Sequence, residues 1–145
     1  MNQNLQLLQR AFLDYLEAEK FGNPPQELYE PINYILSIGG KRMRPVLLLA
    51  ATSSFSSEWK KALPAALGIE IFHNFTLIHD DIMDNAELRR GKPTSHMVYG
   101  ENRAILSGDA MMLLSLQYIL KSVSESNRAV IVDGYLDVAL HVCIG

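Results

Sequence analysis

The sequence of 145 residues contains a single cysteine, Cys143. One thiol cannot form an internal disulfide, and it excludes a zinc site built from cysteines. Basic residues are also few, because 13 Lys and Arg stand against 16 Asp and Glu and the net charge is −3. No tract rich in Lys or Arg is longer than a few residues, so nucleic acid is not expected as a partner.

Long apolar runs are missing as well. No run reaches the roughly 18 residues that a transmembrane helix needs, so no transmembrane segment is predicted. The first twenty residues are amphipathic, carry acids throughout and lack the apolar core of a secretory leader. Apolar residues make up 48% of the chain and charged residues 20%, which is typical of one globular domain. We therefore expect a soluble, cytoplasmic protein with a single domain over residues 1–145.

Strand-like alternation is nearly absent, whereas apolar residues recur at helical spacing, so the sequence predicts an all-α fold. Pro and Gly suggest where helices begin and end. The first predicted helix carries Leu5 to Leu16 and ends before Gly22. The others are expected from Pro31 to Gly39, from Pro45 onward, and over about 62–84, 102–121 and 127–145.

Three aspartates, Asp80, Asp81 and Asp84, cluster at the end of the helix expected over 62–84. At about 100° per residue, His73, Asp80 and Asp84 lie along one stripe of the helix surface, and Asp81 lies about 100° further round the helix. Acids at this place are unfavourable, because like charges at i,i+4 repel and a helix C-terminus is already partly negative. Such a local conflict indicates either a functional site or compensation by nearby cations.

Two interpretations of these acids remain open. Arg89, Arg90 and Lys92 follow closely and could neutralise the acids in a solvated cluster of salt bridges. Alternatively, the carboxylates hold a hard cation such as Mg²⁺, for which oxygen ligands without cysteine are suited. Mg²⁺ is usually held by one or two carboxylates together with the phosphate oxygens of a substrate.

The segment GGKRMRP, from Gly39 to Pro45, is a basic loop that carries Lys41, Arg42 and Arg44. Its glycines permit close approach of the backbone, and its cations precede a helix N-terminus, which together indicate an anion site. A plain basic surface loop is the alternative. RRGK, residues 89–92, is a second basic segment, so the pattern suggests two phosphorylated ligands, one bound through metal and one bound directly.

In combination, GGKRMRP and HNFTLIHDDIMDNAELRRGKPTSH resemble the trans-isoprenyl diphosphate synthases, also called polyprenyl synthetases. The resemblance covers residues from about 28 to the end, and Asp80-Asp81-Ile82-Met83-Asp84 corresponds to the first aspartate-rich motif of that family. It implies an antiparallel helix bundle of the isoprenoid synthase type. It also implies a homodimer, for which the helix expected over 102–121 could supply the interface.

The resemblance further implies a Mg²⁺-dependent, head-to-tail condensation of an allylic diphosphate with isopentenyl diphosphate. Asp80 and Asp84 would bind Mg²⁺, Asp81 would support the same cluster, and Arg89 would hold the allylic diphosphate. The residues implied for isopentenyl diphosphate are Lys41, Arg44, His73 and Arg90.

Phe75 and Thr76 stand five and four residues before Asp80, about 6–8 Å along the helix axis. In the family that the sequence resembles, a bulky residue here shortens the product, so Phe75 indicates a short product of about C15–C20. Packing of Phe75 in the core is the alternative, because its angular offset from Asp80 is about 140°.

The sequence departs from the family in length. Family members are usually about twice as long and carry a second aspartate-rich motif, whereas no second D-D-x-x-D string occurs here. We therefore expect the N-terminal half of a polyprenyl synthetase domain, apparently truncated. A natural, non-catalytic helical partner of a full-length synthase is the alternative.

Overall fold

The computed structural model describes residues 3–22 and 24–144, and it confirms the all-α fold. The helices are α1 (Gln3–Ala18), α2 (Gln26–Ser37), α3 (Met43–Phe55), α4 (Leu63–Met83), α5 (Ser95–Tyr99), α6 (Glu101–Leu120) and α7 (Arg128–Ile144). Two short 3₁₀ turns, Trp59–Ala62 and Glu125–Asn127, precede α4 and α7, and strands β1 (Leu88–Arg89) and β2 (Lys92–Pro93) lie between α4 and α5.

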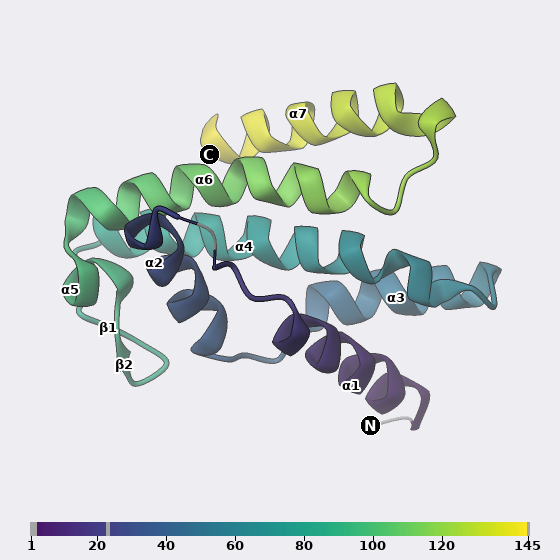
Figure 1. Ribbon diagram of the computed structural model, residues 1–145, viewed down its shortest axis with the longest axis horizontal. Coiled ribbons are helices and arrows are strands. Elements are labelled where there is room, and N and C mark those ends of the chain that lie inside the picture. Colours follow the sequence, from purple (N-terminus) through teal and green to yellow (C-terminus); the bar gives the residue numbers. More distant parts are fainter. Residues whose placement is uncertain (1–2, 23, 145) are drawn as a thin grey trace.

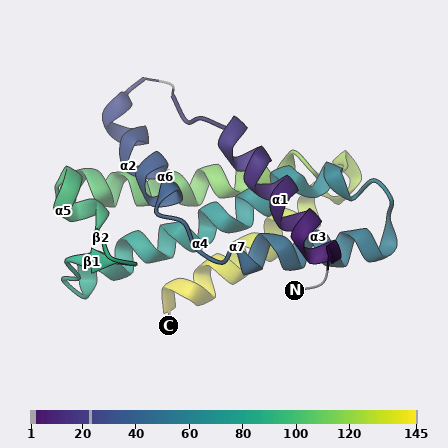
Figure 2. The ribbon, with the colours of Figure 1, turned by 90° about the horizontal axis from the view of Figure 1, so that it is seen from below.

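The long helices α4 and α6 run antiparallel at the centre of the molecule (Figure 1), and they share the most extensive contact between elements of the described chain. Helix α7 returns along α6 at one edge, while α1 and α3 lie at the other edge. Viewed from below, α2 projects to one side and the end of α7 to the other, while α1 runs obliquely across the molecule (Figure 2). Within residues 3–22 and 24–144, no helix combines the length and apolar character that a membrane crossing needs.

The boundaries of α2 differ from those expected. The helix begins at Gln26, so the prediction that it begins at Pro31 is wrong, and Pro31 lies inside it. A proline within a helix leaves the carbonyl four residues earlier without its usual donor. Here that carbonyl, on Glu27, accepts hydrogen bonds from Nε and Nη2 of Arg103 at 3.3 and 3.2 Å. A side chain of α6 therefore compensates for the interruption.

The other long helices agree closely with the sequence. α4, α6 and α7 begin within one residue of the predicted positions, and the last residue predicted for α7, residue 145, lies outside the described residues. α3 begins at Met43, two residues before the predicted start at Pro45. Pro45 thus falls in the first turn, where its missing N–H removes no helical hydrogen bond.

The sequence did not predict the small hairpin formed by β1 and β2. Asn85 adopts a positive φ of 51° directly after α4 and ends that helix. Arg90 and Gly91 then have φ values of 53° and 77°, as in the two-residue turns whose twist suits a hairpin. The hairpin pairs Arg89 with Lys92, and it places the second basic segment beside the end of α4.

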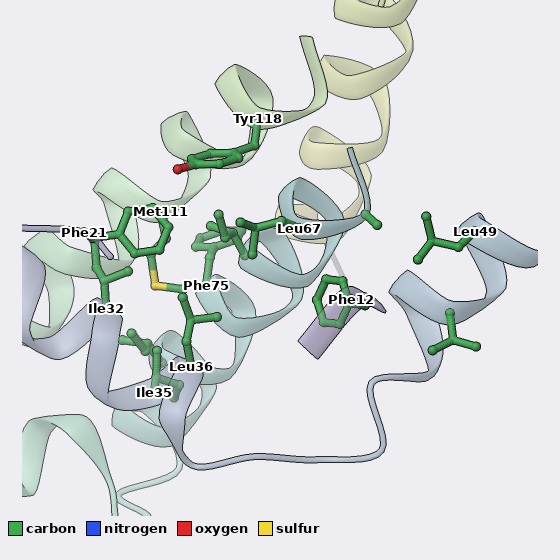
Figure 3. Close-up of a cluster of buried hydrophobic side chains, with 14 of the residues drawn as sticks. Phe12, Phe21, Ile32, Ile35, Leu36, Leu49, Leu67, Phe75, Met111 and Tyr118 are labelled. Carbon is green, nitrogen blue, oxygen red and sulfur yellow. The ribbon is translucent and has the colours of Figure 1, made fainter. Parts of the chain in front are cut away.

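A hydrophobic core lies where α1, α2, α3 and α6 meet α4 (Figure 3). Its fully buried large apolar side chains include Phe12, Ile32, Ile35, Leu49, Leu67, Ile71, Ile78 and Met111. Burying one side chain of this size contributes about 1.5–3 kcal/mol. The core therefore fixes α4 along most of its length and leaves its aspartate-bearing end at the surface.

Gly68 allows α4 and α6 to approach closely. A Cβ atom at this position would lie 2.6 Å from the carbonyl oxygen of Ser115 and 2.9 Å from the backbone nitrogen of Ile119. Both are backbone atoms within a helix, so they cannot move aside as a flexible side chain could.

We expect Gly68→Ala to lower the free energy of unfolding by about 1–3 kcal/mol, because the added methyl group forces the two helices apart. Urea denaturation followed by circular dichroism would measure the change.

Gly134→Ala is the matched control, because Gly134 also lies within a helix and its added methyl group would meet no atom within 4 Å beyond the neighbouring residues and backbone of its own helix. This control should raise the free energy of unfolding by about 0.4–1 kcal/mol through the unfolded state. Equal effects of the two substitutions would contradict close packing at Gly68.

Candidate functional site

The three aspartates at the end of α4 lie in different surroundings. Asp80 and Asp84 are exposed, whereas Asp81 is only 2% exposed. Asp84 is the C-terminal cap residue of α4, and its N–H donates to the carbonyl oxygen of Asp80 at 2.8 Å. Two carboxylates therefore face solvent and one faces the protein.

Asp81 forms a two-pronged ion pair with Arg89 of β1. Arg89 Nε donates to Asp81 Oδ2 at 2.8 Å, and Nη2 donates to Oδ1 at 2.7 Å. The hydrogen bond to Asp81 is the largest of the effects that raise the pKa of Arg89, which burial opposes. Compensation by a nearby cation is thus present for Asp81, and it also fixes the orientation of Arg89.

Asp80 and Asp84 make no ion pair within residues 3–22 and 24–144. They lie one helical turn apart at the surface and fit a Mg²⁺ ion, which commonly takes one or two protein carboxylates. In the described part of the chain, no three acidic, histidine or cysteine side chains gather around a common point. A cation bound here would therefore take its remaining ligands from substrate oxygens and water.

The predicted residues for direct binding of a diphosphate come together around one cavity of about 550 Å³. This basic cavity is lined by Gly40, Lys41, Arg42, Met43, Arg44, Glu70, His73 and Arg90. Arg90 reaches it from the hairpin turn, and its guanidinium packs against Gly40 in the space that a side chain would occupy. Four cations from two separate segments thus line this space, and the exposed three, Lys41, Arg44 and Arg90, suit it to an anion.

His73 lies half-buried in the wall of this cavity. Burial lowers its pKa below the ordinary value of 6.5, and the charges of Arg44, Arg90 and Arg89 lower it further, while Glu70 opposes them. The imidazole is therefore neutral at neutral pH, and it can donate one hydrogen bond without adding charge.

Arg42 does not share the role expected for the cations of the basic loop. It is 5% exposed, and its Nη1 donates to Glu70 Oε1 at 2.5 Å while its Nη2 donates to the carbonyl oxygen of Leu36. Sequence reasoning missed this pair. A signal was present, because Glu70 and Asn74 are polar residues one turn apart within an apolar helix.

A second, larger space of about 700 Å³ lies between α4, the end of α6 and α7. We call it the α4–α7 cleft. Its lining comprises Arg44, Ile69, Phe72, His73, Thr76, Asp80, Ile119, Val130, Ile131, Gly134, Tyr135, Val138 and Val142. Arg44, His73 and Asp80 make one part of this lining polar, and the rest is mostly apolar. The cleft therefore suits a molecule with an anionic head and a hydrocarbon tail.

The two residues predicted to influence chain length lie on different sides of α4. Thr76 lines the α4–α7 cleft, whereas Phe75 is 8% exposed and belongs to the hydrophobic core (Figure 3). The ring of Phe75 lies 5.3 Å from that of Phe72, and Phe72 contacts Tyr135 across the cleft at 5.5 Å. Phe75 therefore does not line the cleft itself, but it contacts Phe72, which does.

The chain is similar to known proteins over most of its length. Residues 25–145 match the family described as Polyprenyl synthetase. A geranylgeranyl diphosphate synthase of Methanosarcina mazei is 44% identical over 104 residues, which cover 72% of this chain and 32% of that protein. A farnesyl diphosphate synthase of Geobacillus stearothermophilus is 41% identical over 127 residues, covering 86% of this chain and 42% of that protein.

The fold is also that of a solved relative. The crystal structure of a geranylgeranyl pyrophosphate synthase has a TM-score of 0.90 and 40% sequence identity, and the match covers 99% of this chain and 43% of that one. The chain thus spans about a third to two fifths of the length of these relatives.

We expect the His73 imidazole to titrate below pH 6.5, and Arg44→Gln to raise its pKa because one repelling charge is removed. NMR titration of the ring protons would measure both values. An exposed Arg→Gln change at Arg10, which pairs with Asp14 on α1, should leave the His73 titration unchanged.

The same shift predicts a loss of stability as pH falls. Below about pH 6.5 the unfolded chain takes up a proton at His73 more readily than the folded chain, so unfolding is favoured until the folded pKa is passed. His73→Gln should remove this component. A His73 pKa at or above 6.5 would contradict the arrangement of cations described here.

Proposed function

This chain belongs to the polyprenyl synthetase family, and from that premise we propose that it serves a Mg²⁺-dependent prenyl transfer from an allylic diphosphate to isopentenyl diphosphate. One observation carries the proposal: Arg44 and His73 line both the basic cavity and the α4–α7 cleft, so the two spaces meet at these residues. Two diphosphates bound in them would have their heads in close proximity, as a condensation requires.

The allylic diphosphate is assigned to the α4–α7 cleft, with its head near Asp80 and its tail among the apolar residues. Asp80 and Asp84 would hold Mg²⁺, which when bound neutralises charge on a leaving diphosphate. Arg89 lies beside them with Nε and Nη2 engaged by Asp81. Its Nη1 makes no hydrogen bond to the described chain, so it can donate to a diphosphate oxygen.

Isopentenyl diphosphate is assigned to the basic cavity. Lys41, Arg44 and Arg90 compensate the charge of its diphosphate directly, and neutral His73 donates a hydrogen bond. No aspartate lines this cavity, so the substrate there is bound without the metal site.

In the proposed reaction the allylic C–O bond breaks, and its electron pair leaves with the diphosphate. The double bond of isopentenyl diphosphate then forms the new C–C bond, and a proton passes to the released diphosphate. The residues of this chain would bind and orient both substrates. The names of the relatives support a short product, about C15–C20.

A homodimer is proposed on the exposed side of α6. Leu106 and Leu113 are 60% and 65% exposed, and they lie seven residues apart, close to two full turns, on one face of the helix. Cytoplasmic location stays a prediction.

We expect Asp80→Ala combined with Asp84→Ala to abolish the Mg²⁺-dependent part of the affinity for geranyl thiolodiphosphate, a non-hydrolysable allylic analogue. Calorimetric titrations with Mg²⁺ and with EDTA would separate the metal-dependent part from the rest.

The matched control is Asp133→Ala with Asp137→Ala, which removes the same charge at the same i,i+4 spacing from the exposed face of α7. This control should retain the Mg²⁺ effect. Equal affinities of the wild type and the Asp80/Asp84 variant in Mg²⁺ would remove the metal assignment. Mg²⁺-independent binding in all proteins would favour a non-catalytic partner of a full synthase.

Thr76→Phe should shorten the α4–α7 cleft, because the ring would extend from the wall into the cleft. We expect it to weaken binding of farnesyl and geranylgeranyl thiolodiphosphates more than that of the dimethylallyl analogue. Thr76→Val, which keeps the volume, is the control. A uniform loss across all tail lengths would argue against tail selection at Thr76.

Phe75→Ala tests the role expected for Phe75. If Phe75 forms the floor of the cleft, Phe75→Ala should improve the affinity for analogues with long tails relative to those with short tails. As a core residue only, it would leave this preference unchanged and cost about 3–5 kcal/mol of stability.

A further inference from the structure

The ion pair between Arg42 and Glu70 is unusual for its burial. Their side chains are 3% and 5% exposed, and no other ion pair in the described ranges has both partners buried to this extent. Arg42 nevertheless belongs to the loop whose neighbouring cations, Lys41 and Arg44, are exposed at the basic cavity.

Arg42 connects three helices. It is the N-cap residue of α3, its Nη2 donates to the carbonyl oxygen of Leu36 in α2, and its Nη1 donates to Glu70 of α4. Asn74, one turn further along α4, donates its Nδ2 to Glu70 Oε1 at 3.2 Å and to the Glu70 carbonyl oxygen at 2.7 Å. The carboxylate that receives Arg42 is therefore itself held in place.

The loop backbone requires such support. Gly39 and Gly40 have φ values of 89° and 143°, and Arg42 adopts a left-handed conformation with φ 50° and ψ 38°. A residue with a side chain is rarely found there, and the conformation persists only where its surroundings determine it. A buried guanidinium without a partner is strongly unfavourable, so Arg42 restricts the loop to conformations in which it meets Glu70.

We infer that Arg42, Glu70 and Asn74 form a positioning clamp for the diphosphate-binding loop. The clamp holds the backbone on either side of Arg42 so that Lys41 and Arg44 converge on His73, which lies three residues after Glu70 on the same helix. Glu70 compensates the charge of Arg42, and the cations left to attract a diphosphate are those of the exposed side chains. This inference rests on the proposed binding of isopentenyl diphosphate in the basic cavity.

The first test is Arg42→Lys, which keeps the charge but cannot reproduce the two-directional contact with Glu70 and Leu36. Calorimetric titration with isopentenyl diphosphate in EDTA isolates the basic cavity. We expect affinity to fall by about tenfold, the equivalent of one charge-assisted hydrogen bond. Mg²⁺-dependent binding of geranyl thiolodiphosphate should change much less, whereas general unfolding would reduce both.

Arg10→Lys is the matched control, because Arg10 is an exposed arginine with an ion-pair partner on the same helix. It should change neither affinity. Loss of both affinities in Arg42→Lys to the same extent would overturn the specific positioning role.

A second variant separates positioning from folding. Arg42→Met combined with Glu70→Met replaces the pair by apolar side chains, a change that proteins often tolerate without loss of stability. We expect a folded protein with weakened isopentenyl diphosphate binding in EDTA. A folded double variant with wild-type affinity would overturn the clamp. A wild type that does not bind isopentenyl diphosphate in EDTA would instead overturn the proposed function of the basic cavity.

Discussion

Close packing of α4 against α6 is the constraint on which the rest of the molecule depends. Gly68 makes room for the backbone of α6, and Gly108 of α6 lies against His79, where a Cβ would be 2.5 Å from the ring. The two contacts lie toward opposite ends of the antiparallel pair. Because α4 is fixed at both places, its aspartate-bearing end, the wall of the basic cavity and the wall of the α4–α7 cleft keep a constant geometry relative to one another.

The charged residues around this helix divide into those held in ion pairs and those exposed at the surface. The acids at the end of α4 would repel one another, but Asp81 turns inward to Arg89 while Asp80 and Asp84 remain exposed. In the same way, Arg42 turns inward to Glu70 while Lys41 and Arg44 remain exposed. At both places an ion pair to a buried carboxylate anchors a segment, and the adjacent charges that make no ion pair in the described chain are left available for ligands.

Much of this could be predicted from the sequence, and the exceptions have physical causes. The long helices were predictable because apolar spacing decides them, and the convergence of Lys41, Arg44, His73 and Arg90 followed from family motifs. The start of α2 could not be predicted, because a distant side chain, Arg103, compensates for Pro31. The inward orientation of Arg42 could not be predicted either, because the spacing of apolar residues does not show which of several adjacent cations has a buried partner.

The shared wall of the two spaces has a thermodynamic consequence. Arg44 and His73 contribute to both linings, so a side chain that turns toward an anion on one side changes the field and the space on the other. Occupancy of the two spaces is then coupled, and such coupling is reciprocal at equilibrium. In the proposed function, whichever diphosphate entered first would alter the affinity for the second by the same factor as in the reverse order, so a preferred sequence of loading would be a matter of kinetics alone.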